Sequence, residues 1–443
     1  MTEYSKEMAK FIVDFVYEDI PKNVVEKTKM HFLDTIGVTI GAFDQPWSEM
    51  VIELVKQTQG SAQSKVIGLD GKYPAMMAAL ANGTMAHGID MDDSGAEGWA
   101  HPGACLVPSG FAVGENEKIS GKELITALLL GYEINGRVDG SLYPSLRDKG
   151  FHATAVVGTI GAAVTAGKIL KLDEEQMVNA LGLAGTQAAG LEEWLNTGDM
   201  SKRLHAGKAA MNGVISAQLA KKGYTGPSSV FEGKYGLAST HTDDYDLPTL
   251  LDGLGEEFKI MDAKFKPFAC CHELCGPIRL ALKAQREHDI KIEDIEKIRI
   301  GLNHVTAENQ LKVAETPLHA QNHPAVAVSI ALVEDQILMK EFFECYSDPK
   351  VSELGKKCEV YVDEEIEENF PSKTGTRLEI ITKDDKYSYF EDNKPIMPYS
   401  KLKEKFKGLA SLQLSEDKVE KFLEMSVGLE DISDINDLSA LLY

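Results

Sequence analysis

The sequence predicts a mainly α-helical fold class, with a large all-helical domain and a smaller α+β domain. Apolar residues recur at helical spacing near the start of the chain, between residues 121 and 222, and after Lys401. Alternating apolar residues, which indicate strands, are found from about residue 295 to residue 380. A chain of 443 residues that is 43% hydrophobic can bury a large core, and its length favours two domains.

The first half of the chain is predicted to be helical. Apolar residues from Met8 to Val16 fall on one helical face. Pro21 marks the start of a second helix, which we expect to run through Phe32 to the small residues Gly37 and Gly41. Further helices are predicted over Gly121–Ile134, Ala153–Leu170, Asp173–Ala189 and Ala206–Lys222.

Small residues line one face of the helix predicted over 153–170. Gly158, Ala162 and Ala166 are spaced one helical turn apart. Such a stripe lets a neighbouring helix axis approach closely. We therefore expect the helices of this region to form one compact domain.

The later part of the chain changes from helical to mixed patterns. Period-two alternation predicts strands around Ile295–Leu302, Val360–Val362 and Leu378–Ile380, with a helix over Ala325–Leu338 between them. Helices return after Lys401 and are expected to pack on the first domain. We therefore expect residues 1–263 and 395–443 to form the all-helical domain, and residues 264–394 to form the α+β domain.

The composition favours a cytoplasmic protein that binds neither nucleic acid nor membranes. The net charge of −23 repels phosphate groups and anionic lipids, and we find no local basic patch. The segment from Thr2 to Glu7 lacks the basic start of a secretory signal, and no run of about 20 apolar residues occurs. Six cysteines in so long a chain do not form a disulfide framework. The same negative charge means that any pocket for an organic acid must be locally positive.

The first cluster of reactive residues lies between residues 87 and 102. It comprises His87, Asp90, Asp92, Asp93, Ser94, His101 and Pro102. Three carboxylates in four residues are compatible with a metal site, but the ligand pattern of an EF-hand is absent. The alternative interpretation is a helix end at which Asp93 and Ser94 are capping residues.

Two further clusters combine histidines and cations with predicted helix starts. His152 directly precedes the helix predicted from Ala153, where the positive end of a helix lowers an imidazole pKa and favours an anion. Lys202, Arg203 and His205 precede the helix predicted from Ala206, and a lysine there can hold a carboxylate or, if desolvated, carry a proton. The alternatives are a structural histidine and a solvated helix start.

The fourth cluster lies at the predicted boundary between the two domains. Lys266 is followed by Cys270, Cys271, His272 and Cys275. Zinc or an iron–sulfur cluster is not favoured, because no second cysteine pair occurs elsewhere at a ligand spacing. The alternative is that Lys266 and one thiol or imidazole face a pocket between the domains.

Several common catalytic motifs are missing from the sequence. It contains no G-x-G-x-x-G after a strand, no Walker A sequence, no G-x-S-x-G and no H-E-x-x-H. Nicotinamide, nucleotide and serine-esterase chemistry therefore lose their main support.

Taken in order, six blocks of the chain resemble the MmgE/PrpD family, which includes 2-methylcitrate dehydratase, cis-aconitate decarboxylase and iminodisuccinate epimerase. The blocks are His31-Phe-Leu-Asp34-Thr-Ile-Gly37; Asn82-Gly83 leading to His87 and His101-Pro102; Gly150-Phe-His152-Ala-Thr154; Met200-Ser-Lys202-Arg-Leu-His-Ala-Gly207; Gly223-Tyr-Thr-Gly226-Pro227; and Lys266-Pro-Phe. The resemblance implies a helical domain built from both chain ends, an α+β lid domain, a homodimer, and an active site in the cleft without metal or other cofactor.

The resemblance also implies the site residues. By the family pattern these are His101, His152 and Lys202 in the catalytic set, and Asp90, Ser94 and Lys266 as substrate ligands. We add Cys271 to the catalytic set and His272 to the substrate ligands, because they lie near Lys266 in the chain. Ser94 replaces the more usual threonine and keeps the hydroxyl. The segment 95–100 is longer than in several members, and Cys271 stands where the decarboxylase type has a histidine, with His272 next to it.

The leading hypothesis is a cofactor-independent hydro-lyase that acts on a small di- or tricarboxylic acid. Lys202 and Lys266 would hold carboxylates, while one histidine removes a proton and the other protonates the departing hydroxyl. An epimerase or isomerase, with Cys271 as second proton carrier, is one alternative. A decarboxylase of a related acid and a non-catalytic organic-acid binding protein are the others.

Overall fold

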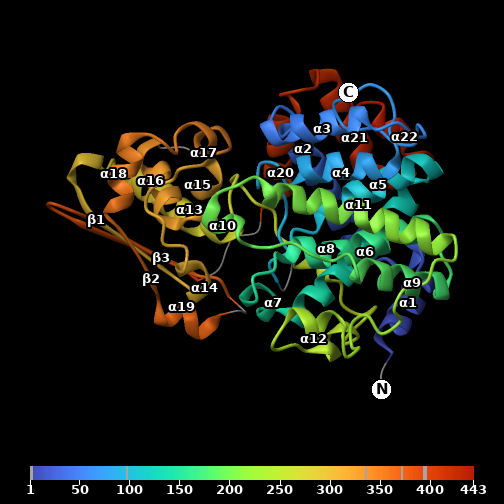
Figure 1. Cartoon of the computed structure of the whole chain (residues 1–443). Coiled ribbons are helices and arrows are strands. Elements are labelled where there is room, and N and C mark those ends of the chain that lie inside the picture. Colours follow the sequence, from blue (N-terminus) through green and yellow to red (C-terminus); the bar gives the residue numbers. More distant parts are fainter. Residues whose placement is uncertain (1–2, 96–97, 335–336, 371–372, 393–396) are drawn as a thin grey trace. The chain divides into compact units, whose positions relative to one another are not determined.

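The computed structural model describes residues 3–95, 98–334, 337–370, 373–392 and 397–443. Most of these residues are helical, and one small sheet lies in the later part of the chain, as Figure 1 shows. The predicted fold class, mainly α with a smaller α+β part, is therefore confirmed. In the described part of the chain, no helix is both long and apolar enough to cross a bilayer.

The chain folds into two compact units. The first contains Met1–Glu193, Ser201–Phe265 and Pro398–Tyr443, and the second contains Trp194–Met200 and Lys266–Met397. The sequence predicts one domain formed by residues 1–263 and 395–443, and a second formed by residues 264–394. Relative to that division, the short segment 194–200 lies in the second unit. Residues 394 and 395, at the other expected boundary, lie outside the described residues.

The first unit is helical. Its α-helices are α1 Tyr4–Asp14, α2 Lys22–Gly41, α3 Pro46–Gln57, α4 Ala75–Ala86, α5 Gly103–Glu117, α6 Gly121–Leu142, α7 Ser145–Asp148, α8 Ala153–Ile169, α9 Glu174–Gly185, α11 Ser201–Lys221, α12 Leu237–His241, α20 Tyr399–Ala410, α21 Glu416–Val427 and α22 Asn436–Ser439. The helices predicted at both ends of the chain are confirmed, and α8 begins at the predicted residue.

Several predicted helix boundaries are wrong. Helix α6 continues past Ile134 to Leu142 because the polar residues that follow are buried and paired: Arg137 Nε donates to Glu133 Oε1 at 2.6 Å. Helix α11 begins at Ser201 rather than Ala206, so Lys202 lies in its first turn and not ahead of it. Helix α9 also ends earlier than predicted, at Gly185.

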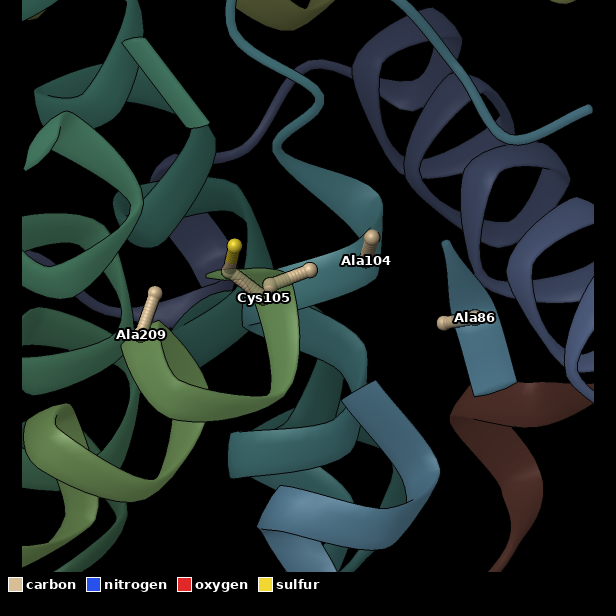
Figure 2. Packing of buried hydrophobic residues seen from close by; sticks show 5 residues of the cluster. Ala86, Ala104, Cys105 and Ala209 are labelled. Carbon is tan, nitrogen blue, oxygen red and sulfur yellow. The ribbon is translucent and has the colours of Figure 1, made fainter. Parts of the chain in front are cut away.

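Glycines allow α4, α5, α8 and α11 to pack closely. A Cβ atom on Gly83 would lie 2.8 Å from the Cα atom of Gly207, and one on Gly158 would lie 2.6 Å from the Sγ atom of Cys105. Both contacts are too close for any side chain, so these positions require glycine. Figure 2 shows part of the small-residue core here, which comprises Ala86, Ala104, Cys105, Ala206 and Ala209. This packing brings the end of α4 and the starts of α5 and α11 together.

The end of the chain packs on α2, as expected. A Cβ atom on Gly37 would lie 2.9 Å from the Phe406 ring of α20, and one on Gly41 would lie 2.8 Å from Leu409. Small residues on α2 therefore accept large apolar residues of α20. This contact anchors the C-terminal segment within the first unit.

The second unit combines short helices with a mixed sheet. Its helices are α10 Trp194–Thr197, α13 Cys275–His288, α14 His304–Ala307, α15 Pro317–Asn322, α16 Pro324–Glu334, α17 Lys340–Glu344, α18 Pro349–Lys356 and α19 Glu364–Asn369. The strands are β1 Ile295–Leu302, β2 Cys358–Val362, β3 Thr376–Thr382 and β4 Lys386–Glu391, in the order β2-β1-β3-β4.

The sheet confirms the strands that alternation predicted. Strand β1 pairs in parallel with β2, where Ile298 faces Cys358, and antiparallel with β3, where Ile300 faces Leu378. The inward residues Ile298, Ile300 and Leu378 are fully buried. The predicted helix from Ala325 is α16, and residues 335–336 of the predicted range lie outside the described part.

Candidate active site

A buried ion pair joins the loop after α4 to the first turn of α11. Lys202 Nζ lies 2.5 Å from Asp90 Oδ2, and the side chains are 3% and 2% exposed. Asp90 has a φ of +56°, a conformation that short polar residues such as aspartate tolerate best. A non-glycine residue in this conformation often marks a functional loop. The result is a positive charge held inside a strongly negative protein.

Two histidine rings lie side by side next to this loop. His87 Nδ1 is 2.7 Å from Asp92 Oδ2, and His101 Nδ1 is 2.6 Å from the carbonyl oxygen of Asp93. The ring centroids of His87 and His101 are 4.9 Å apart. Because a carbonyl oxygen can only accept, Nδ1 of His101 donates, and a neutral His101 has its lone pair on Nε2. A carboxylate orients the His87 ring in the same way.

A third histidine, His152, lies at the N-terminus of α8. Its backbone N–H donates to the carbonyl oxygen of Gly190 at 2.9 Å, and its ring centroid is 5.9 Å from that of His87. Burial, followed by the neighbouring cations and imidazoles of which His205 is the strongest, lowers the pKa of His152 well below its usual range. His152 is therefore neutral at neutral pH and can accept a proton.

Asp93 holds the loop through contacts with three other residues. Its Oδ2 is 2.7 Å from His31 Nδ1 and accepts from the Tyr132 hydroxyl at 2.5 Å, while its Oδ1 accepts from the backbone N–H of Gly103 at 2.9 Å. Burial alone would raise the pKa of Asp93, but the hydrogen bonds from His31 and Tyr132 outweigh it and lower that pKa.

Asp93 thus accepts from the first amide of α5, but it lies ten residues before that helix in the chain. Ser94 makes a different contact: its backbone N–H donates to the carbonyl oxygen of Lys264 at 2.8 Å, and the N–H of Lys264 donates back at 2.9 Å. No helix begins or ends at residues 93–94, which lie in the described part of the chain, so the interpretation of this pair as the caps of a helix end is wrong.

The segment 95–100, which departs from the family pattern, is described only at its ends. The Gly95 N–H donates to the carbonyl oxygen of Ala100 at 2.8 Å, and the Ala100 N–H donates to Asp139 Oδ2 at 3.0 Å. Ala96 and Glu97 lie outside the described residues. The two ends are therefore held together before the chain enters His101.

One group in the described part of the chain has the spacing of metal ligands. Ligand atoms of His87, Asp90 and His101 all lie within 4.8 Å of one another. Imidazole and carboxylate ligands of this kind suit zinc or iron. However, the ammonium of Lys202 already lies against Asp90, and a bound cation would be repelled by it. The protein thus supplies its own positive charge at this point.

The structure brings four of the eight predicted site residues into one cluster of the first unit: Asp90, His101, His152 and Lys202. Ser94 belongs to the same loop. The other three, Lys266, Cys271 and His272, belong to the second unit. There Lys266 is fully buried, Cys271 is partly exposed, and His272 begins a short 3₁₀ helix.

Three residues of the cluster were not selected from the sequence. They are His87, Asp92 and His205. The signal for His205 was its position three residues after Lys202, which is one helical turn. It was missed because the helix start was placed at Ala206. His87 and Asp92 were present in the first motif, but nothing in their spacing indicated the hydrogen bond between them.

Two family models match the sequence of the chain. The MmgE/PrpD N-terminal domain matches residues 6–249, and the MmgE/PrpD C-terminal domain matches residues 268–431. Together the two matches cover most of the chain.

Similar curated proteins span nearly the whole length of the chain. Cis-aconitate decarboxylase of Aspergillus terreus is 27% identical over 470 residues, covering 99% of this chain and 95% of that protein. Cis-aconitate decarboxylase of Homo sapiens is 28% identical over 449 residues, covering 95% of this chain and 90% of that protein.

Proposed function

Because the chain belongs to the MmgE/PrpD family, we propose that it is a lyase that acts on a small carboxylic acid. One observation carries the proposal. Three histidine rings, those of His87, His101 and His152, lie beside the buried ion pair of Asp90 and Lys202. Proton carriers and a fixed cation are what removal of a proton next to a carboxylate requires.

In the leading form of this proposal the enzyme is a hydro-lyase. Neutral His152 removes the proton from the carbon α to a carboxylate, and the negative charge that develops is stabilised by Lys202. His101, in its protonated form, gives a proton from Nε2 to the departing hydroxyl, and water leaves. The carbonyl oxygen of Asp93 holds Nδ1 of His101, so Nε2 is the nitrogen available for this step.

Decarboxylation is the second candidate, because the curated relatives are cis-aconitate decarboxylases and match the chain almost end to end. The same residues would serve: Lys202 would stabilise the charge left when CO₂ departs, and a histidine would protonate the carbon. Cys271 stands where the decarboxylase type has a histidine, and this replacement favours the hydro-lyase over the decarboxylase. We keep Cys271 as a proposed catalytic residue, and Lys266 and His272 as proposed substrate ligands of the second unit.

The proposal is tested by incubating the chelator-treated protein in deuterated water with a panel of di- and tricarboxylic acids. Products are read by mass spectrometry and NMR. Loss of one water from an acid establishes the hydro-lyase, and loss of CO₂ establishes the decarboxylase. Deuterium uptake without either loss would replace both with an epimerase.

A pair of lysine variants serves as the matched control. Lys202→Met should abolish measurable turnover, whereas Lys221→Met, in the last turn of the same helix, should leave it unchanged. Turnover by Lys202→Met at the wild-type rate would contradict the assignment of the buried cation. No reaction of the wild-type protein with any acid would contradict the proposed lyase.

A further inference from the structure

His152 has a second histidine as its direct hydrogen-bond partner. The Nδ1 atoms of His152 and His205 are 3.0 Å apart, and their ring centroids are 5.2 Å apart. Two nitrogens at this distance share one hydrogen, so one ring donates while the other accepts. The contact joins the N-terminus of α8 to the second turn of α11.

The two rings differ in their access to water. His152 is buried, with 4% of its surface exposed, whereas His205 is partly exposed. A Cβ atom at Gly190 would lie 2.4 Å from the Cβ atom of Ala155 and 3.3 Å from His205 Nδ1, so glycine here avoids a clash with Ala155 and a tight contact with the second ring. The pair therefore leads from the interior of the histidine cluster toward the surface of the first unit.

The protonated form of His152 is energetically disfavoured. His205, His87, Lys202 and His101 all face the ring and disfavour its charged form, and burial does the same. After burial, three imidazoles and the ammonium of Lys202 lower the pKa of His152. Transfer onward to a more exposed ring relieves this cost.

We propose that His205 is a proton relay between His152 and solvent. The inference rests on the proposed function, in which His152 is the base. Before reaction, His152 carries its hydrogen on Nδ1 and His205 accepts at Nδ1. His152 Nε2 takes the substrate proton, the Nδ1 hydrogen of His152 moves to Nδ1 of His205, and His205 Nε2 releases a proton to water. Both rings end neutral, with the hydrogen of His152 now on Nε2.

Three variants separate a relay from a residue that only positions His152. His205→Ala removes the relay and leaves space, and His205→Gln keeps a hydrogen-bonding group that does not titrate. Leu204→Ala, one residue away and 44% exposed, is the control. We expect both His205 variants to lower kcat about tenfold or more, but less than the loss of about 10²–10⁴-fold expected for His152→Gln. Imidazole added to the buffer should restore His205→Ala but not the buried His152→Gln.

Glutamine keeps a hydrogen-bonding group at position 205 but cannot pass a proton on. Wild-type kcat in His205→Gln would therefore overturn the relay and leave His205 a positioning role.

NMR of protein with ¹⁵N-labelled histidines tests the relay without turnover. Exchange of the His152 ring hydrogen with solvent should be slower in both His205 variants than in the wild type and Leu204→Ala. Equal exchange in all four proteins would overturn the relay even if the enzyme is active. A wild-type protein inert toward every acid but with fast, His205-dependent exchange would contradict only the proposed function.

Discussion

Two buried residues of the site, His152 and Asp93, differ in charge. The pKa of His152 is lowered by burial and by the cations and imidazoles around it, so this ring is neutral. For Asp93, burial is outweighed by hydrogen bonds from His31 and Tyr132, so this carboxyl is ionised. A neutral base and a fixed carboxylate thus lie in one buried region because their hydrogen-bond partners differ.

The first prediction concerns His152. His152→Gln should lower turnover by about 10²–10⁴-fold, because glutamine cannot accept the substrate proton. A base is active when deprotonated, so wild-type kcat/KM should fall as the pH falls through the lowered pKa of His152. The ordinary pKa of histidine is about 6.5, and this acid limb should lie below that pH. The limb should be missing from His152→Gln. Profiles of kcat/KM against pH for both proteins measure this, and an unchanged limb in the variant would assign it to another group.

At the scale of elements, α20 contacts the loop that follows α4, although the two are far apart in the sequence. Lys405 Nζ lies 2.7 Å from Asp34 Oδ1 of α2 and donates to the carbonyl oxygen of Met91 at 2.7 Å. Met91 lies between Asp90, which pairs with Lys202, and Asp92, which orients His87. One lysine of the C-terminal segment therefore links α2 to the loop.

The second prediction is that Lys405→Met destabilises the protein by about 3–5 kcal/mol, because it leaves Asp34 buried without its cation. Burial raises the pKa of Asp34 to about 6 against the opposing effect of Lys405. A carboxyl whose pKa is raised in the folded state stabilises most below its unfolded pKa, and this contribution is lost as the pH rises through the folded value. The variant should therefore lose more stability at pH 7.5 than at about pH 5.

Urea unfolding at the two pH values measures this effect. Lys401→Met, an exposed change on the same helix, should shift stability by no more than about 0.5 kcal/mol. Relative to Asp34→Asn alone, the double variant Asp34→Asn/Lys405→Met should lose the same stability at both pH values, because residue 34 no longer carries an ionisable carboxyl. An equal loss for Lys405→Met at both pH values would show that Asp34 is not the cause.

Some features of the helices and strands could be predicted from the sequence, and others could not. Alternation predicted a strand where β1 lies, since Ile298 and Ile300 point to one buried face. The first turn of α11 was missed because Ser201, Lys202 and Arg203 look like a solvated segment, although Lys202 is paired inside the unit. A partner more than a hundred residues away in the chain leaves no local pattern to detect.

For the whole molecule, composition predicted a property of the site. A chain with a net charge of −23 repels carboxylate substrates at long range, so positive charge must be concentrated where a substrate binds. In the first unit Lys202 is a buried cation, although Asp90 balances its charge, so this expectation stays a prediction. Which side chains would surround it was not predictable from composition, because that depends on the glycine contacts that bring α4 and α11 together.

The third prediction concerns the same net charge and the stability of the folded chain. Self-repulsion of surplus carboxylates disfavours the compact state, and salt screens it over a Debye length of about 10 Å at 0.1 M. Raising NaCl from about 10 mM to about 200 mM at pH 7.5 should therefore stabilise the protein by about 1 kcal/mol, which raises Tm by roughly 1 °C for a chain of 443 residues. Calorimetry or circular dichroism measures the shift. Near the isoelectric point of about 4.9 the net charge vanishes, and the salt effect should vanish with it. An equal rise at both pH values would mean that salt acts on hydrophobic burial instead of charge repulsion.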